Sequence, residues 1–450
     1  MISADSFWTS SLRSIPRGDA ITRILAAAIA AVEPATTVRR AVLRQGNRLV
    51  IGGLSYDLPA YRRIFLLGLG KAAVPMSAAL AELLGYDLAD ALVITKHFPL
   101  ESPPALARFP ILTGNHPIPG ENSLEAGKRA LEFLAALRED DLLFCLISGG
   151  GSALVTAPVE GIALAELQTM TSTLLACGAR IDEINILRRR LDRFKGGGVV
   201  QQANGATIVS LILSDVVGNP LETIASGPTV PDPTQAADAR KIIQKYRLKD
   251  RLPPPILRAA ENTPPPLPAD HPHFARVQNL IVGDNLMAAQ AALRQAKTEG
   301  FHPYLLRVDL QGEARQVAFD LATILRQAWQ TGDPAPRPAC LLAGGETTVT
   351  LRGNGRGGRN TELALAAVTE LADFPDAMLI TLATDGEDGP TDAAGAVVTG
   401  ETFRRALALG LDPQDHLQRN DSYTFFDALD DLLRPGPTGT NVNDLIFLFT

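Results

Sequence analysis

The chain has 450 residues, of which 46% are hydrophobic and 20% are charged, and its formal net charge is −7. This composition is typical of soluble globular proteins, and the length predicts two domains. The negative charge argues against a nucleic-acid-binding surface, so an anionic ligand would need a local basic cluster.

The cysteines Cys145, Cys177 and Cys340 are odd in number and far apart in the sequence. They indicate neither a disulfide framework nor a metal site, and we expect a cytoplasmic protein. The apolar segment 24–32 resembles the core of a signal peptide, but Glu33 and Pro34 follow it directly, so we interpret it as the first helix. No apolar stretch has the length that a membrane span needs.

Short runs rich in Val, Ile and Leu alternate with longer helix-like segments. In the first part of the chain these runs lie at residues 63–70, 91–96, 142–152, 207–216 and 279–285. Because they are continuously apolar rather than alternating, they predict strands that are buried on both faces of a parallel sheet. The pattern resumes with a strand and a glycine-rich stretch at 339–351, a helix at 361–372 and a strand at 378–386.

A proline-rich segment separates the two halves of this pattern. Seven prolines lie between residues 253 and 268, a composition that cannot continue a helix or a central strand. We therefore place the domain boundary near this segment. The predicted fold class is α/β.

The turn after the run at 63–70 combines glycines with a lysine. Gly68, Gly70 and Ala73 match the G-x-G-x-x-G/A pattern of dinucleotide-binding turns, whereas Lys71 is typical of a phosphate site. A dinucleotide site normally has an acidic residue at the end of the second strand, where this chain has Lys96. The two lysines favour phosphate transfer, and an NADP-type site remains open.

Two further glycine-rich turns are candidate anion sites. The first follows a strand and could form an anion-binding nest of backbone N–H groups and hydroxyls, or only a tight connection to a helix. Its candidate residues are Ser148, Gly149, Gly150, Gly151 and Ser152. The second begins with Lys195 and is equally compatible with an ordinary helix C-terminus.

The second half of the chain contains a basic turn at residues 352–360, with three arginines and four glycines. Arginine in such a turn can bracket a phosphate or a carboxylate with two hydrogen bonds. Arg359, Asn360 and Glu346 of the adjoining turn are therefore candidate site residues. The alternative is a flexible solvated loop.

An acidic turn follows at residues 384–392, where Asp385 and Asp388 stand close together in the sequence. Carboxylate oxygens beside a phosphate are suitable ligands for Mg²⁺, although two Asp-Gly pairs can also be no more than turns. Asp215, at the end of another buried strand, is a further candidate carboxylate.

Several long motifs resemble those of one known family. They are GLGKAA, HPIPGENS, SGGGSAL, ILSDVVGNPLETIASGPTVPDPT, GGETTVTLRGNGRGGRNTELALA, ATDGEDGPTDAAGAVV and GPTGTNVNDLIF. In this order, over nearly the whole chain, they closely resemble the glycerate 2-kinase family, whose C-terminal part is called MOFRL. Two positions depart from the family pattern, because Gly120 replaces an aspartate and Arg190 replaces a histidine.

The resemblance implies an enzyme that uses ATP and Mg²⁺ to phosphorylate D-glycerate at its C2 hydroxyl. It implies a Rossmann-like domain at residues 1–252 and a smaller MOFRL-type domain at 270–450, with the active site in the cleft between them. A last strand that returns to the N-terminal domain is left open. D-Glycerate and the nucleotide are the expected partners, nucleic acid and membranes are not, and a homodimer is left open.

The resemblance also implies roles for particular residues. The family's proposed phosphoryl-contacting lysine and arginine correspond to Lys71 and Arg359. Asp385 is the third catalytic candidate, and Asp385 and Asp388 are the candidate metal ligands. Family members have often been labelled hydroxypyruvate reductases, so an NAD(P)-dependent reductase is the alternative function. The third possible function is that of a nucleotide-sensing binding protein that does not turn over a substrate.

Overall fold

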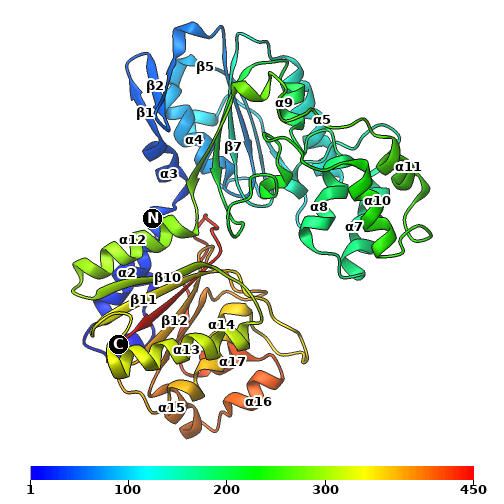
Figure 1. The fold of residues 1–450 in the computed structure, drawn as a ribbon. Helices are drawn as coiled ribbons and strands as arrows, with labels where there is room; N and C mark the ends of the chain where they lie inside the picture. Colours follow the sequence, from blue (N-terminus) through cyan, green and yellow to red (C-terminus); the bar gives the residue numbers. More distant parts are fainter. Residues whose placement is uncertain (1) are drawn as a thin grey trace. The chain divides into compact units, whose positions relative to one another are not determined.

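The computed structural model describes residues 2–450 (Figure 1). Its internal contacts divide the chain into two compact units. The parallel-sheet unit comprises Pro34–Ser214 and Asn219–Val282, and the mixed-sheet unit comprises the residues up to Glu33, Asp215–Gly218 and Gly283–Thr450. The domain ranges 1–252 and 270–450 stay a prediction; the compact units instead group the beginning of the chain with its end.

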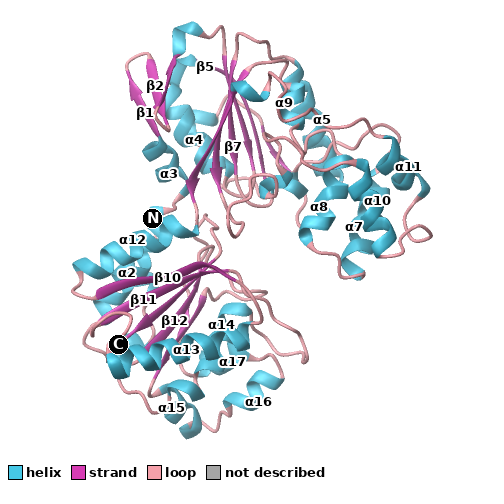
Figure 2. Ribbon diagram, viewed as in Figure 1, coloured by secondary structure: helices cyan, strands magenta, loops and turns pink. Residues whose placement is uncertain are grey.

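The parallel-sheet unit is built on a six-stranded sheet of order β6-β5-β4-β7-β8-β9 (Figure 2). Its strands are β4 (Ile64–Leu69), β5 (Leu88–Thr95), β6 (Ile111–Thr113), β7 (Leu142–Ile147), β8 (Thr207–Leu213) and β9 (Val277–Gly283). All pairings from β6 to β8 are parallel. Every residue of β4 and β7 is buried, as their continuously apolar sequences predict.

The central strand β4 ends level with both of its neighbours. Leu69, its last residue, pairs with Ile94 of β5 and with Ile147 of β7. Because these strands all run in one direction, the turns that follow them meet at the same edge of the sheet, where α/β proteins place their ligands.

Helices and a small antiparallel sheet surround this sheet. The helices are α3 (Pro34–Ala41), α4 (Ala73–Leu84), α5 (Glu121–Ala135), α6 (Gly151–Leu154), α7 (Leu164–Ala176), α8 (Ile181–Arg190), α9 (Gly198–Gln202), α10 (Ala236–Lys245), α11 (Pro254–Asn262), η2 (Leu58–Ala60), η3 (Gly85–Asp87), η4 (Pro104–Leu106), η5 (Ile224–Ser226) and η6 (Phe274–Arg276). The small sheet consists of β1 (Val42–Gln45), β2 (Arg48–Ile51) and β3 (Leu54–Asp57). Helices α7, α8, α10 and α11 lie together (Figure 1). They share an apolar cluster of their own, which includes Leu174, Leu187 and Ile256.

The proline-rich segment contains a helix, contrary to the sequence-based expectation. Helix α11 begins at Pro254, and the other proline run begins at Pro264, beyond the last helical residue. Proline is tolerated in the first turn of a helix because the backbone N–H groups there have no intrahelical acceptor. The prolines therefore flank the helix instead of interrupting it.

The mixed-sheet unit has a six-stranded sheet of order β10-β11-β15-β12-β13-β14 (Figure 2). Its strands are β10 (His302–Leu310), β11 (Ala339–Gly345), β12 (Met378–Ala383), β13 (Gly395–Thr399), β14 (Leu432–Leu433) and β15 (Asp444–Phe449). β10 and β11 are parallel, whereas the last strand, β15, runs antiparallel between β11 and β12. Asp444, at the start of β15, therefore lies beside the ends of both β11 and β12, where it pairs with Gly345 and Ala383.

The helices of this unit come from both ends of the chain. They are α1 (Ser10–Ser14), α2 (Gly18–Ala31), α12 (Asn285–Thr298), α13 (Ala314–Thr331), α14 (Arg359–Ala367), α15 (Thr402–Ala408), α16 (Pro413–Gln418), α17 (Ser422–Ala428), η1 (Ala4–Phe7) and η7 (Thr369–Leu371). Helix α2, which contains most of the apolar segment 24–32, packs against α12.

The predicted α/β class, with a parallel sheet in the N-terminal part and a second α/β sheet in the C-terminal part, is confirmed. Within residues 2–450, no single helix is long and apolar enough to cross a membrane, although α2 and α3 taken together meet the same criteria of length and composition.

Candidate active site

In the parallel-sheet unit, the turns after β4 and β7 are held together by backbone hydrogen bonds. The backbone N–H of Lys71 donates to the Gly149 carbonyl at 2.9 Å, and that of Ala72 donates to Ser148 Oγ at 3.0 Å. Gly70 has a φ of +121°, and a Cβ there would lie 2.2 Å from Ser148 Oγ. Only glycine fits this position without a rearrangement, so this part of the dinucleotide-like pattern is explained by the close approach of two turns.

Gly68 has a different packing role. A Cβ at this position would lie 2.3 Å from Ser77 Oγ of α4. The absence of a side chain thus allows α4 to lie close against β4.

Basic side chains gather around Gly150. This glycine adopts the left-handed conformation, and a Cβ on it would lie 3.2 Å from His116 Cδ2 and 3.3 Å from Lys71 Cγ. Burial, together with the charges of Lys71 and Lys96, lowers the pKa of His116 to about 4. At neutral pH, His116 is therefore uncharged, and the two lysines provide the positive charge at this edge of the sheet.

The 148–152 turn, for which an anion nest is predicted, has backbone donors without an acceptor among the described residues. Within residues 2–450, the backbone N–H groups of Gly149 and Gly150 donate no hydrogen bond. The Ser152 hydroxyl lies 2.8 Å from the Ser226 hydroxyl, which donates to Asn185 Oδ1 at 3.3 Å. Donors and a lysine therefore surround this turn, as an anionic ligand requires.

Lys195, in contrast, is engaged inside the protein. It is buried, and its Nζ lies 2.5 Å from Asp192 Oδ2 and 3.1 Å from the Val155 carbonyl. Burial lowers the pKa of Lys195, while the neighbouring Asp192 opposes this shift. In this structure, the lysine joins the segment after α8 to the end of α6, and its predicted contact with a ligand would require that ion pair to open.

The two departures from the family pattern also have structural explanations. The Arg190 guanidinium donates to the carbonyls of Ala260 and Thr263, at the C-terminal end of α11. Arg190 therefore caps this helix end, and its positive charge interacts favourably with the negative end of the helix dipole. At Gly120, a Cβ would lie 2.5 Å from Asn115 Oδ1, so the local packing leaves no room for an aspartate without a rearrangement.

In the mixed-sheet unit, the candidate residue Arg359 is the first residue of α14 and is bound by two carboxylates. Its Nε and Nη2 donate to the two oxygens of Asp444, at 2.5 Å and 3.1 Å, and its Nη1 donates to Glu346 at 2.7 Å. Burial raises the pKa of Glu346; Arg359 opposes this rise, and the charges of Asp444 and Asp215 add to it. Arg359 is thus held in place by a bidentate ion pair and a second acidic side chain.

Asp444 was not a sequence-based candidate, although it lies in the motif GPTGTNVNDLIF. Eighty-five positions separate Asp444 from Arg359, so nothing in the local sequence connects the two. A usable signal was the single carboxylate directly before the apolar run 445–449.

Asp388 caps the N-terminus of α14. It is 1% exposed, and it accepts hydrogen bonds from the backbone N–H groups of Asn360 at 3.0 Å and Thr361 at 2.8 Å. The Thr361 hydroxyl donates to it at 2.8 Å. Burial raises the pKa of Asp388 to about 6, against the effect of these hydrogen bonds. Both carboxylate oxygens of this predicted metal ligand therefore already serve as acceptors, and Asn360 is buried beneath the cap.

Asp385 directly follows Thr384 at the end of β12 and is half-buried. Its Oδ1 accepts from the Glu387 N–H, and its carbonyl accepts from the Thr438 N–H, both at 3.1 Å. Within residues 2–450, no group of three His, Cys, Asp or Glu side chains is arranged to hold a metal ion. Mg²⁺ at nucleotide sites commonly uses only one or two carboxylates together with phosphate oxygens, and the partly accessible Asp385 fits that requirement better than Asp388 does.

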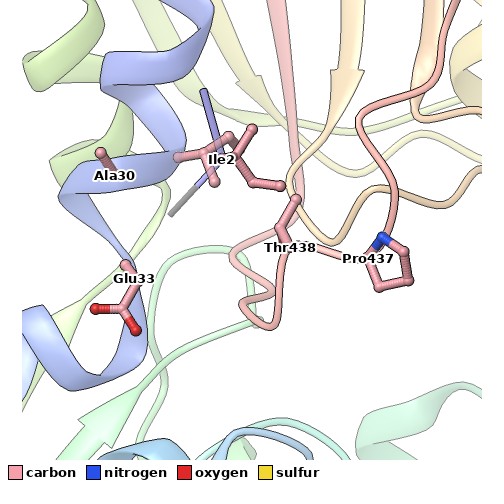
Figure 3. A pocket seen from close by; sticks show the side chains of 6 residues that line it. Ile2, Ala30, Glu33, Pro437 and Thr438 are labelled. Carbon is pink, nitrogen blue, oxygen red and sulfur yellow. The ribbon is translucent and has the colours of Figure 1, made fainter. Parts of the chain in front are cut away.

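A pocket of about 240 Å³ lies in the same unit (Figure 3). Ile2, Ala30 of α2 and the loop residue Thr438 contribute to its wall. The Thr438 hydroxyl donates to the Thr384 carbonyl, which connects this loop to the end of β12. None of these residues was a sequence-based candidate.

Two family models match different parts of the chain. Residues 20–261 match DUF4147, described as a domain of unknown function, and residues 339–444 match the MOFRL family. The chain is 37% identical to glycerate 2-kinase of Pyrococcus horikoshii over 94% of this chain and 95% of that protein. It is 40% identical to D-glycerate 2-kinase of Thermotoga maritima over 85% of this chain and 90% of that protein.

A solved structure is also similar. The crystal structure of glycerate kinase from Thermotoga maritima matches with a TM-score of 0.85 and 38% identity, over 95% of this chain and 97% of that one. Such identity over nearly the full length of several relatives shows common descent, and the chain belongs to the glycerate 2-kinase family, whose C-terminal part is the MOFRL family.

Proposed function

We propose that this protein transfers the terminal phosphoryl group of ATP to the C2 hydroxyl of D-glycerate. The observation that carries the proposal is the identity of 37% to 40% with two glycerate 2-kinases over most of the chain. The retained basic and acidic residues at the two sheet edges are consistent with phosphoryl transfer, in which catalysis consists mainly of positioning and charge stabilisation.

Lys71 is the proposed phosphate-binding residue of the parallel-sheet unit. It stands beside the two unused N–H groups of Gly149 and Gly150, and a cation next to such donors is suited to phosphate oxygens. Its charge would stabilise the negative charge that develops on the transferring group.

Arg359 has the corresponding proposed role in the mixed-sheet unit. Asp444 and Glu346 hold its guanidinium in one orientation, which reduces the entropy lost when it binds an anion. ATP-dependent kinases use Mg²⁺ to neutralise phosphate charge, and we propose Asp385 as the carboxylate that would hold the ion.

The alternative of a hydroxypyruvate reductase has less support. A dinucleotide site needs an acidic residue after the second strand to bind the ribose hydroxyls, and Lys96 occupies the position directly after β5. Its charge contributes to the low pKa of His116, so this edge of the sheet is basic. A cytoplasmic location and a homodimer stay predictions.

Two assays on the same purified protein test the proposal against this alternative. The first measures ADP release from ATP and Mg²⁺ with and without D-glycerate, and the second measures oxidation of NADH or NADPH with hydroxypyruvate. We expect D-glycerate-dependent ADP release and no nucleotide oxidation above background. Oxidation of NADH or NADPH with hydroxypyruvate, without D-glycerate-dependent ADP release, would assign the protein to the reductases. Inactivity in both assays, with ATP binding intact, would favour a nucleotide-sensing protein.

A further inference from the structure

Three consecutive arginines at the end of α8 have different surroundings. Arg189 is buried and forms an ion pair with Asp232 at 2.9 Å. Arg190 binds the carbonyls at the end of α11. Arg188 is half-buried, and within residues 2–450 its guanidinium makes no hydrogen bond or ion pair. Burial lowers the pKa of Arg188, because it disfavours the charged form, and the negative charge of Asp192 opposes this shift.

Arg188 lines a small pocket together with Ser152, Thr156, Asp192 and Lys195. Among the described residues that line this pocket, Asp192 is the only carboxylate, and both of its oxygens already accept hydrogen bonds. It binds Lys195 and accepts from the Thr156 hydroxyl at 2.7 Å and from two backbone N–H groups. With two cations and one carboxylate, the pocket carries one positive charge in excess.

Helix α8 is joined to the glycine-rich turn through a chain of hydrogen bonds. Asn185 lies one helical turn before Arg188, on the same face of α8. Its Oδ1 accepts from Ser226, whose hydroxyl in turn contacts Ser152. Ser152 of this turn lines the pocket together with Arg188, so Arg188 lies near the turn that presents the unused N–H groups.

The size of the pocket restricts what it can hold. Its volume is about 20 Å³, which is room for little more than a water molecule. A nucleotide base or a triphosphate does not fit there, whereas one end of a small carboxylate does. A planar guanidinium is the side chain best suited to bind a carboxylate with two parallel hydrogen bonds.

We infer that Arg188 binds the carboxylate of the acceptor substrate, a small 2-hydroxy acid. The inference rests on the proposed function for the identity of the acid, and it adds the residue that recognises the acid group. Arg188 would then select for acids over neutral polyols, because the uncharged analogue would leave the guanidinium without a partner.

The test compares Arg188→Met, Arg188→Gln and Arg188→Lys with the wild type and with Arg193→Met. Arg193 is an exposed arginine of the same segment, and its replacement by methionine changes the net charge by the same amount as Arg188→Met. The readouts are KM for D-glycerate, KM for ATP, and the Kd of D-glycerate measured by calorimetry without ATP. Circular dichroism and thermal unfolding report whether each variant is folded.

We expect Arg188→Met and Arg188→Gln to raise both KM and Kd for D-glycerate by about 10- to 100-fold, the loss typical of a charge-assisted hydrogen bond. Arg188→Lys should have an intermediate effect, and KM for ATP should change less than about twofold in every variant. Arg193→Met should match the wild type.

Unchanged D-glycerate binding in a folded Arg188→Met variant would overturn the inference, as would an effect on KM for ATP alone. If none of the three variants folds, Arg188 is structural and the inference is equally wrong. A wild type that binds D-glycerate through Arg188 but does not phosphorylate it would instead refute the proposed function and leave the carboxylate site standing.

Discussion

Asp388 can be tested as a helix cap or as a metal ligand, because the two roles differ in how the stability of the protein depends on pH and on Mg²⁺. The side chain is 1% exposed and caps α14, and burial raises its pKa from 3.8 to about 6. Between these two values the folded protein binds more protons than the unfolded chain, so stability falls as the pH rises. The stabilising contribution is complete below pH 3.8 and is lost as the pH passes about 6.

The shift in the pKa of Asp388 determines how much the free energy of unfolding changes with pH. A rise in pKa from 3.8 to about 6 corresponds to a difference on the order of 3 kcal/mol in the free energy of unfolding. Asp388→Asn removes this titration and also replaces one acceptor of the cap by an amide donor, which costs about 1 kcal/mol. We therefore expect the wild type to be the more stable of the two near pH 4, and to lose about 3 kcal/mol relative to the variant by about pH 7.

Urea unfolding of both proteins, followed by far-UV circular dichroism at several pH values, measures this difference. Asp373→Asn, which changes an exposed carboxylate of the same unit, is the control and should show no comparable pH dependence. If the stability of the wild type minus that of Asp388→Asn stays constant or grows with pH, burial does not raise the pKa of Asp388. A stabilisation by Mg²⁺ that is present in the wild type and absent in Asp388→Asn would identify the residue as a metal ligand instead of a cap.

Three further predictions concern activity. Lys71→Ala should lower kcat by about 100-fold in a folded protein, with a smaller change in KM, because it removes a preorganised charge; near wild-type kcat would mean that the lysine serves only structure. Arg359→Lys should lower kcat at least about tenfold, since an ammonium cannot reproduce the two contacts with Asp444, and full activity would show that a point charge suffices. Asp385→Asn should raise the Mg²⁺ concentration needed for half-maximal rate, whereas superimposable Mg²⁺ titrations would leave Asp385 as a turn residue.

The features that could be predicted from the sequence are those with a local pattern. The apolar run 63–70 and its glycines predicted a buried strand and a tight turn, and the structure has β4 followed by a turn in which Gly70 lies against Ser148. Strand burial and turn chemistry depend on neighbouring residues, so a single sequence contains the information needed.

Contacts between distant segments could not be predicted in this way. The partner of Arg359 is Asp444, which no local pattern connects to it, and the cap of α14 is Asp388, 28 positions from Asn360. An acidic cluster in a glycine-rich turn has the same composition whether it binds a metal or caps a helix. Only the fold distinguishes the two, just as it distinguishes Arg188 from its paired neighbours Arg189 and Arg190.

Phosphorylation of D-glycerate on its C2 hydroxyl is tested by identifying the product. The purified protein is incubated with D-glycerate, ATP and Mg²⁺, and the phosphoglycerate is identified by ³¹P and ¹³C NMR. We predict 2-phosphoglycerate, with phosphorus coupling to C2. Accumulation of 3-phosphoglycerate, or no phosphorylated product under conditions in which the protein is folded and binds ATP, would contradict phosphorylation at C2.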